Sequence, residues 1–139
     1  MIVLDTNVIS EPLRAEGNPH VLAWLDEQSV ETLYLTTISL AELRYGVAAL
    51  PAGRRRTNLE RAVEERIVAT FGPRILPFDA AAAAASAEIR VRTRSAGKSL
   101  GLADSYIAAT AAAHGFAIAS RDIAPFRAAG LQVIDPWAA

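Results

Sequence analysis

The sequence predicts an α/β fold in which a parallel sheet is covered by helices on both faces. Short apolar runs that are typical of buried strands alternate along the chain with longer segments that have helical periodicity. Strands separated by helices are joined by crossovers, which place neighbouring strands parallel and helices over both faces. The 139 residues contain no linker and no internal repeat, so we expect a single domain that spans 1–139.

Five apolar runs are expected to form the strands of this sheet. They are short and bounded by turn residues, which favours strands over helices where apolar residues are continuous. The predicted strands are residues 2–4, 33–35, 75–76, 116–119 and 132–134.

Six segments are expected to form helices, and most of them carry a start or stop signal. Asn7 is expected to cap a brief helix that breaks near Pro12, and Asn18 followed by Pro19 is a typical helix start. Asp79 precedes an alanine-rich segment, which we interpret as helix because alanine is the best helix former. The five longer helices are predicted at residues 19–28, 39–50, 54–70, 80–95 and 102–114. No helix is expected between the last two strands.

The composition restricts the kinds of site that the chain can build. It has no cysteine and only two histidines, so it contains neither a disulfide frame nor a thiolate or histidine-rich zinc site. Any metal must therefore be bound by oxygen, which favours Mg²⁺ or Mn²⁺ over Zn²⁺. No stretch is long and apolar enough to span a membrane, and the N-terminus does not resemble a signal peptide. The expected location is the cytoplasm.

The charge is distributed unevenly along the chain, although the net charge is only −1. Residues 54–98 contain ten basic against five acidic side chains, and the remainder contains four basic against ten acidic. A basic face beside an acidic pocket suits a polyanion that is held by its phosphates. Each basic cluster is equally well explained as the solvated face of a helix. The two clusters are Arg54, Arg55, Arg56, Arg61 and Arg66, and Arg90, Arg92, Arg94 and Lys98.

Four acidic residues lie at the ends of elements that a parallel sheet would bring together. Asp5 and Asp122 follow predicted strands, and Glu42 and Asp104 lie in the first turns of predicted helices. In open α/β sheets the functional crevice lies outside the carboxyl ends of the strands. Carboxylates gathered there repel one another unless a cation lies among them, and a hard divalent metal is the simplest candidate.

Such a carboxylate set is suited to the hydrolysis of a phosphodiester. Two metal ions roughly 4 Å apart can activate a water and stabilise the leaving oxygen. Asp5, Glu42, Asp104 and Asp122 are the candidate ligands and catalytic residues, and Thr6 and Ser120 are candidate supporting residues that position water or hold a carboxylate. The sequence contains no Ser-His-Asp triad, Walker loop or dinucleotide fingerprint.

Each acid also has a structural explanation when it is taken alone. Ser39 and Glu42 fit a capping box, in which the glutamate bonds back to the backbone of the first residue. Asp104 in a first helical turn is favoured by the helix dipole. Asp5 and Asp122 are also acceptable as turn residues after strands. The four together exceed what capping requires.

The same residues carry a resemblance that runs the whole length of the chain. The chain resembles PIN-domain nucleases, most closely VapC-type toxins of bacterial toxin–antitoxin modules and, among these, the FitB-like branch. The terminal Asp135-Pro136-Trp137 looks like the asparagine, proline and tryptophan ending of many relatives. The four motifs are Met1–Ser10, Ser39–Leu43, Leu102–Ala109 and Ser120–Asp122.

The resemblance implies a three-layer α/β/α sandwich around a central parallel sheet of four to five strands. It further implies Mg²⁺- or Mn²⁺-dependent cleavage of RNA, a homodimer, and a small cognate antitoxin that blocks the site and through which alone the protein contacts DNA. The segments around Ala80–Ala85 and Ala108–Ala113 offer small-residue surfaces, and we expect the homodimer to pack through them. One departure is visible, since many relatives carry an additional acid where this chain has Pro125 before Phe126. Asp122 must then supply the fourth carboxylate.

Three functions are compatible with this sequence. The first is a metal-dependent endoribonuclease that acts as the toxin of a toxin–antitoxin module. The second keeps the chemistry but makes the protein a housekeeping RNA-processing nuclease. The third is a binding subunit that acts mainly within a DNA-bound repressor complex. An adjacent antitoxin gene separates the second from the others, and growth on induction with and without Asp5→Asn separates the first from the third.

Overall fold

The computed structural model describes residues 1–139 and is built on a five-stranded sheet. The strands are β1 (Ile2–Leu4), β2 (Leu33–Thr36), β3 (Ile75–Leu76), β4 (Ala117–Ala119) and β5 (Val133–Ile134). Their order in the sheet is β3-β2-β1-β4-β5, and every neighbouring pair is parallel. In the centre, Val3 lies opposite Tyr34 on one side and Ile118 on the other. The predicted parallel sheet is confirmed.

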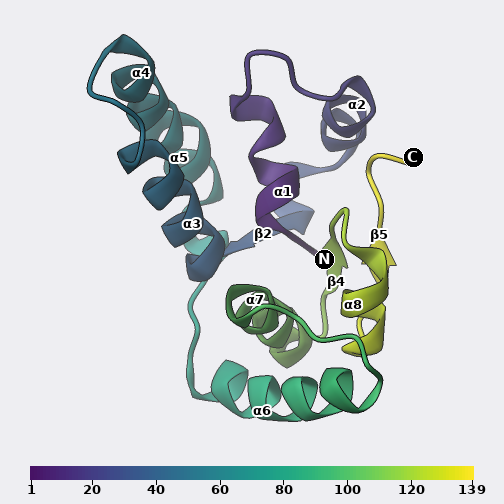
Figure 1. Cartoon of the computed structure of the whole chain (residues 1–139). Coiled ribbons are helices and arrows are strands. Elements are labelled where there is room, and N and C mark those ends of the chain that lie inside the picture. The colour runs from purple at the N-terminus through teal and green to yellow at the C-terminus, as the bar shows by residue number, and fades with distance from the viewer.

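Helices form a layer on each side of this sheet (Figure 1). One side carries α1 (Thr6–Ile9), α2 (Pro19–Glu27), α3 (Thr37–Ala48), α4 (Arg54–Ala62) and α5 (Ala69–Phe71). The other carries α6 (Ala80–Ser95), α7 (Leu102–His114) and α8 (Ile123–Ala128). A π-helical stretch, η3 (Val63–Val68), joins α4 to α5, and short 3-10 turns lie at Glu11–Leu13, Val30–Thr32 and Gly72–Arg74.

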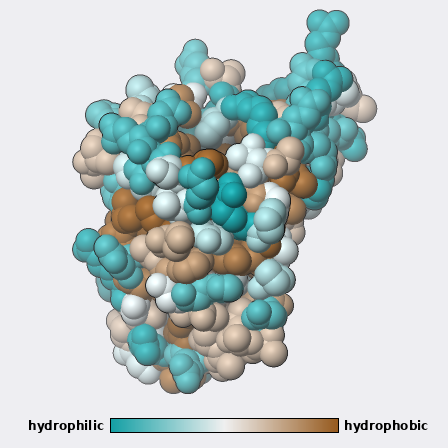
Figure 2. Space-filling model, turned by 180° about the vertical axis from the view of Figure 1, so that it is seen from behind, coloured by the Kyte–Doolittle hydropathy of each residue, from teal (hydrophilic) through white to brown (hydrophobic).

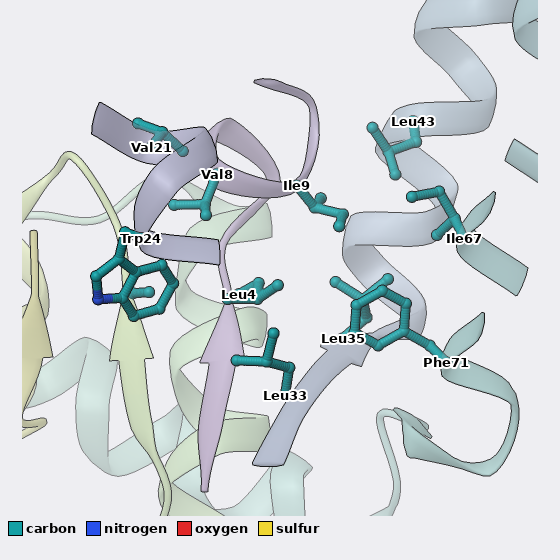
Figure 3. Packing of buried hydrophobic residues seen from close by; sticks show 11 residues of the cluster. Leu4, Val8, Ile9, Val21, Trp24, Leu33, Leu35, Leu43, Ile67 and Phe71 are labelled. Carbon is teal, nitrogen blue, oxygen red and sulfur yellow. The ribbon is translucent and has the colours of Figure 1, made fainter. Parts of the chain in front are cut away.

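Each face of the sheet has its own apolar core, because successive strand side chains point to opposite faces. Leu4 of β1 packs with Leu35 and with helix residues such as Val8, Trp24 and Phe71, as Figure 3 shows. The neighbouring β1 residue belongs to the other core. That core contains Val3, Leu76, Ile89, Ile107, Ile118 and Phe126. The two cores establish the three-layer α/β/α sandwich.

Two expectations about the helices away from the carboxylates were wrong. The sequence pattern predicted no helix between the last two strands, whereas the structure has α8 there. Parallel strands cannot be joined by a tight hairpin, so the parallel pairing of β4 with β5 requires a crossover element. The expected small-residue surface at Ala108–Ala113 is also largely absent, because Ala108, Ala109 and Ala111 are completely buried.

The surface differs between the two ends of the molecule. The arm formed by α4 projects from the body and is mainly hydrophilic; it lies at the upper right in the view from behind (Figure 2). The outer side of α6 presents alanines instead, and Val91 on that helix is 68% exposed. No helix in the structure has both the length and the apolar character that a membrane crossing needs.

Candidate active site

All four predicted acids lie at the carboxyl edge of the sheet, around the ends of β1, β2 and β4. Asp5 directly follows β1 and is the N-cap of α1, and Asp122 is the N-cap residue of α8, which follows β4. Glu42 lies on α3, which begins where β2 ends, and Asp104 lies in the first turn of α7. The parallel topology is therefore what brings together residues up to 117 positions apart in the sequence.

Asp5 is the buried centre of this group, with only 2% of its surface exposed. Its Oδ1 accepts a hydrogen bond from the Thr6 backbone N–H at 2.8 Å, and its Oδ2 accepts one from the Ser120 hydroxyl at 2.7 Å. The pKa of Asp5 is raised to about 6, and burial is the largest cause. The charges of Asp104 and Asp122 contribute to this rise, while the hydrogen bonds from Ser120 and Thr6 oppose it. The carboxylate is fixed in position but poorly compensated in charge.

Glu42 is exposed and is held by Thr6 rather than by its own helix. The Thr6 hydroxyl donates to Glu42 Oε1 at 2.6 Å and lies 3.0 Å from the Ser39 hydroxyl. Since a hydroxyl has one proton, the Ser39 hydroxyl can donate in turn to Thr6, which gives a chain of three side chains. Thr6 thus contacts one acid through its backbone and another through its side chain.

The capping box that was the alternative explanation of Glu42 does not form. The N-cap of α3 is Thr36, whose hydroxyl accepts a hydrogen bond from the Ser39 backbone N–H at 3.1 Å. Ser39 is therefore the third residue of the helix, and Glu42 lies in the next turn, beyond the reach of a capping interaction. Capping does not explain why this position carries a glutamate.

Asp104 and Asp122 complete the edge. Burial raises the pKa of Asp104, which is half-buried, and the charges of Glu42 and Asp122 raise it further. Asp122 is exposed, and its backbone N–H donates to the Ser120 hydroxyl at 3.0 Å. Ser120 therefore connects the first and the fourth acid, since its own hydroxyl donates to Asp5.

Asn7 has a role that the sequence did not reveal. It was expected to cap the first helix, but Asp5 occupies the N-cap of α1. The Asn7 side chain instead reaches the fourth motif: its Nδ2 lies 3.4 Å from Asp122 Oδ2, and its Oδ1 lies 3.5 Å from the Arg121 backbone nitrogen. These residues are more than 110 positions apart, so no local pattern could predict the contact.

No basic side chain neutralises the four acids. The ion pairs of the structure are Arg14–Glu11, Arg44–Glu64 and Arg56–Glu60, and none includes a member of this group. Mutual repulsion acts on Asp5 from Asp104 and Asp122. An external cation is therefore the natural partner of this site.

The donor set is chemically suited to Mg²⁺ or Mn²⁺, because all its ligands are oxygens. No three histidine, cysteine, aspartate or glutamate side chains converge closely enough to bind one metal ion directly. This arrangement is compatible with Mg²⁺, which usually keeps several waters and takes one or two carboxylates from the protein. Asp5 and its neighbours would then share an ion through both direct and water-mediated contacts.

A groove of about 620 Å³ leads away from the site between α3, α4 and the segment after α1. It begins at Thr6 and Glu42, and its floor is apolar. The apolar lining comes from Leu13, Leu43, Val47, Leu50 and Leu59. Arg55, which belongs to the first of the two basic clusters, also lines the groove. The other cluster lies on and after α6, where Arg90 and Arg94 line a separate pocket.

Comparison with known proteins assigns this architecture to a family. Residues 2–131 match the PIN domain. The chain is 53% identical over 137 residues to VapC ribonuclease Y4jK of Sinorhizobium fredii, covering 99% of this chain and 98% of that protein. It is 49% identical to Toxin FitB of Neisseria gonorrhoeae, covering 99% of each.

Solved structures agree with the sequence relatives. The crystal structure of FitAcB from Neisseria gonorrhoeae superimposes with a TM-score of 0.95 at 48% identity and covers 100% of both chains. DNA-bound VapBC from Salmonella typhimurium has the same fold, with a TM-score of 0.79 at 22% identity over 97% of each chain. The chain therefore belongs to the PIN-domain family, and its relatives within that family are VapC- and FitB-type toxins of toxin–antitoxin systems.

Proposed function

We propose that this protein is a metal-dependent endoribonuclease and the toxin of a toxin–antitoxin module. The observation that carries the proposal is the buried Asp5, surrounded at the edge of the sheet by three further carboxylates and by no cation. The relative named as a VapC ribonuclease supports RNA as the substrate. The whole chain, 1–139, acts as one nuclease domain on RNA in the cytoplasm.

Asp5, Glu42, Asp104 and Asp122 are the residues that would hold Mg²⁺ or Mn²⁺. When bound there, the metal supplies an activated water for attack on phosphorus and stabilises the charge that develops on the phosphate oxygens. The protein's own contribution is orientation. Ser120 and the Thr6 backbone fix both oxygens of Asp5, the Thr6 hydroxyl fixes Glu42, and Asn7 restrains Asp122.

A cognate antitoxin is proposed as the protein partner, and the toxin is proposed to form a homodimer. The structure of FitAB bound to the IR36 DNA fragment is similar to this chain, with a TM-score of 0.94 at 48% identity over 99% of this chain. We expect contact with DNA to be made only through the antitoxin. That neighbour also favours a second candidate function, in which the protein is mainly a regulatory subunit of the DNA-bound complex.

Glutamine substitution at position 42 tests the catalytic proposal. Glu42→Gln preserves size and can still accept the Thr6 hydrogen bond, but it removes the charge that a metal ligand needs. The variant is expected to fold normally, to show a weaker Mn²⁺-induced rise in melting temperature, and to lose most RNA cleavage. Cleavage by the parent protein should stop in EDTA and return with Mg²⁺ or Mn²⁺. Parental cleavage by a folded Glu42→Gln, or full activity in excess chelator, would refute the proposed site.

Growth on induction distinguishes the toxin from the regulatory subunit. Expression of the parent protein without the antitoxin is expected to stop growth, and expression of Asp5→Asn is expected to permit it. If the parent and Asp5→Asn arrest growth equally, the arrest does not come from this site.

A further inference from the structure

Four arginines line one open pocket beside the groove that leads from the acidic site. The pocket has a volume of about 840 Å³ and lies between α4, η3 and the chain segment 12–15. Its nine lining residues include no acid. The arginines are Arg14, Arg54, Arg55 and Arg66, contributed by three separate parts of the chain.

The acids of the neighbouring helices form no ion pair with Arg54, Arg55 or Arg66. Glu60 is paired with Arg56 at 3.0 Å, and Glu64 is paired with Arg44. Arg54 and Arg55 have no acidic partner.

The other two arginines are held by groups that leave the pocket positive. Arg66 donates to the backbone carbonyl oxygen of Pro12 at 3.1 Å, which fixes the guanidinium without cancelling its charge. Arg14 alone has an acidic partner, the buried Glu11 at 3.3 Å. The pocket therefore keeps a strong positive charge.

The first turn of α4 is basic, whereas helix N-termini usually favour acidic residues. Its first turn is Arg54-Arg55-Arg56 with no acid, and the N-cap Gly53 provides no side-chain hydrogen bond. The helix dipole and the free backbone N–H groups at this end favour anions and disfavour cations. The arrangement is unfavourable in the free protein and becomes favourable when an anion binds, as is typical of a functional position.

The arginine pocket is continuous with the groove that reaches the acids. The two cavities share Leu13, Arg14, Ala15, Arg55 and Leu59 in their linings. The combined surface therefore carries the four arginines of the pocket, the apolar floor of the groove, and the acids Glu16 and Glu42 that also line the groove. Figure 1 shows α4 standing above α3, opposite the segment that follows α1, so the two walls of this surface come from distant parts of the chain.

We propose that the arginine pocket binds the phosphate backbone of the RNA strand, at a distance from the phosphate that is cleaved. This inference rests on the proposed function. Guanidinium groups match phosphate oxygens with paired hydrogen bonds, and apolar surface accommodates the bases of a single strand. An acidic segment of a protein partner is the other possible occupant, but it has no phosphate to place at the carboxylate edge.

The test is RNA affinity in EDTA, where metal-dependent cleavage is stopped. Arg54→Ala/Arg55→Ala is compared with Arg56→Ala/Arg61→Ala, which removes the same charge from the same helix. Neither Arg56 nor Arg61 is among the residues that line the pocket. Loss of two phosphate contacts should weaken binding of a fluorescent single-stranded RNA about 25-fold in 0.1 M salt and reduce the salt slope by roughly 1.4. Arg56→Ala/Arg61→Ala is the control and should leave the RNA affinity and the salt slope nearly unchanged.

Thermal unfolding separates this role from a structural one. Arg54→Ala/Arg55→Ala should melt at the parental temperature or higher, because it removes cations from a helix N-terminus. If the two double variants weaken RNA binding equally, the attraction is diffuse and not specific to the pocket. If neither double variant weakens RNA binding, the pocket does not bind RNA. Parental RNA affinity combined with a loss of antitoxin affinity would assign the pocket to the protein partner. Each of these three results overturns the proposal.

Cleavage by the parent protein in Mg²⁺ is read separately. If the parent binds RNA through the arginines but cuts no RNA, the proposed function fails and the binding site stands. If the parent cuts RNA and the Arg54→Ala/Arg55→Ala variant binds and cuts it equally well, the binding site fails and the proposed function stands.

Discussion

Asp5→Asn should stabilise the metal-free protein at neutral and alkaline pH. Asp5 is buried, and the charges of Asp104 and Asp122 repel its carboxylate. The ionised form of Asp5 is therefore unfavourable in the folded state. An asparagine can accept the Thr6 backbone hydrogen bond and can face the Ser120 hydroxyl with its amide group. The substitution thus removes the charge and keeps the contacts.

The magnitude follows from the shift in the pKa of Asp5 from 3.8 to about 6. The folded state binds the Asp5 proton more tightly than the unfolded state. The stability that Asp5 contributes is therefore fully present below pH 3.8 and is lost as the pH rises through about 6. A shift of this size corresponds to about 3 kcal/mol in the free energy of unfolding above pH 7. About half of that difference, roughly 1.5 kcal/mol, is already present at pH 5.

Urea unfolding in EDTA at pH 5 and pH 8 measures this difference. The advantage of Asp5→Asn over the parent should grow by about 1.5 kcal/mol between the two pH values. Asp26→Asn, an exposed change on α2, is the control and should stay within about 0.5 kcal/mol of the parent. Addition of Mn²⁺ should reduce the difference in the free energy of unfolding between Asp5→Asn and the parent at pH 8, because Mn²⁺ stabilises the folded parent protein. If this difference in stability does not depend on pH, the inference that ionised Asp5 destabilises the folded state is refuted.

Three further predictions concern the cap, the partner and the assembly. Thr36→Ala should cost about 1 kcal/mol in urea unfolding, because it removes the N-cap of α3, whereas Ser39→Ala should not show the loss expected of a cap. We expect the antitoxin to place an apolar segment over the groove floor and an arginine or lysine among the acids. Val47→Glu, which puts a charge into that floor, should weaken antitoxin binding by at least tenfold in calorimetry, and an unchanged affinity would place the antitoxin elsewhere. Light scattering at micromolar concentration should give the mass of a homodimer, and a large charged residue at the exposed Ala84 on α6 should shift the protein toward a monomer, whereas a monomeric parent would contradict the assembly.

Local sequence rules were sufficient for most of the fold. Strand residues such as Ile2–Leu4 are apolar and short, and the long helices carry their signals, such as Asn18 with Pro19 at the start of α2 and Gly115 at the end of α7. These rules act within one turn or one strand. They failed at Ser39, where a local capping pattern was present but a residue three positions earlier was in the better place to cap α3.

The sequence by itself determined the chemistry of the site, because residue type decides it. A chain without cysteine that places acids after strands and near the starts of helices can bind a metal there only through oxygen.

Only the tertiary structure decided how these groups act on one another. Thr6 reaches Glu42, Asn7 reaches Asp122, and Arg14 joins the arginines of α4, although each pair is 36 or more positions apart. The physical reason is that parallel crossovers bring the ends of distant strands to one edge of the sheet. The burial of Asp5 and the repulsion among the acids arise only at that edge. No local stretch of the sequence shows them, because the edge is assembled from distant segments.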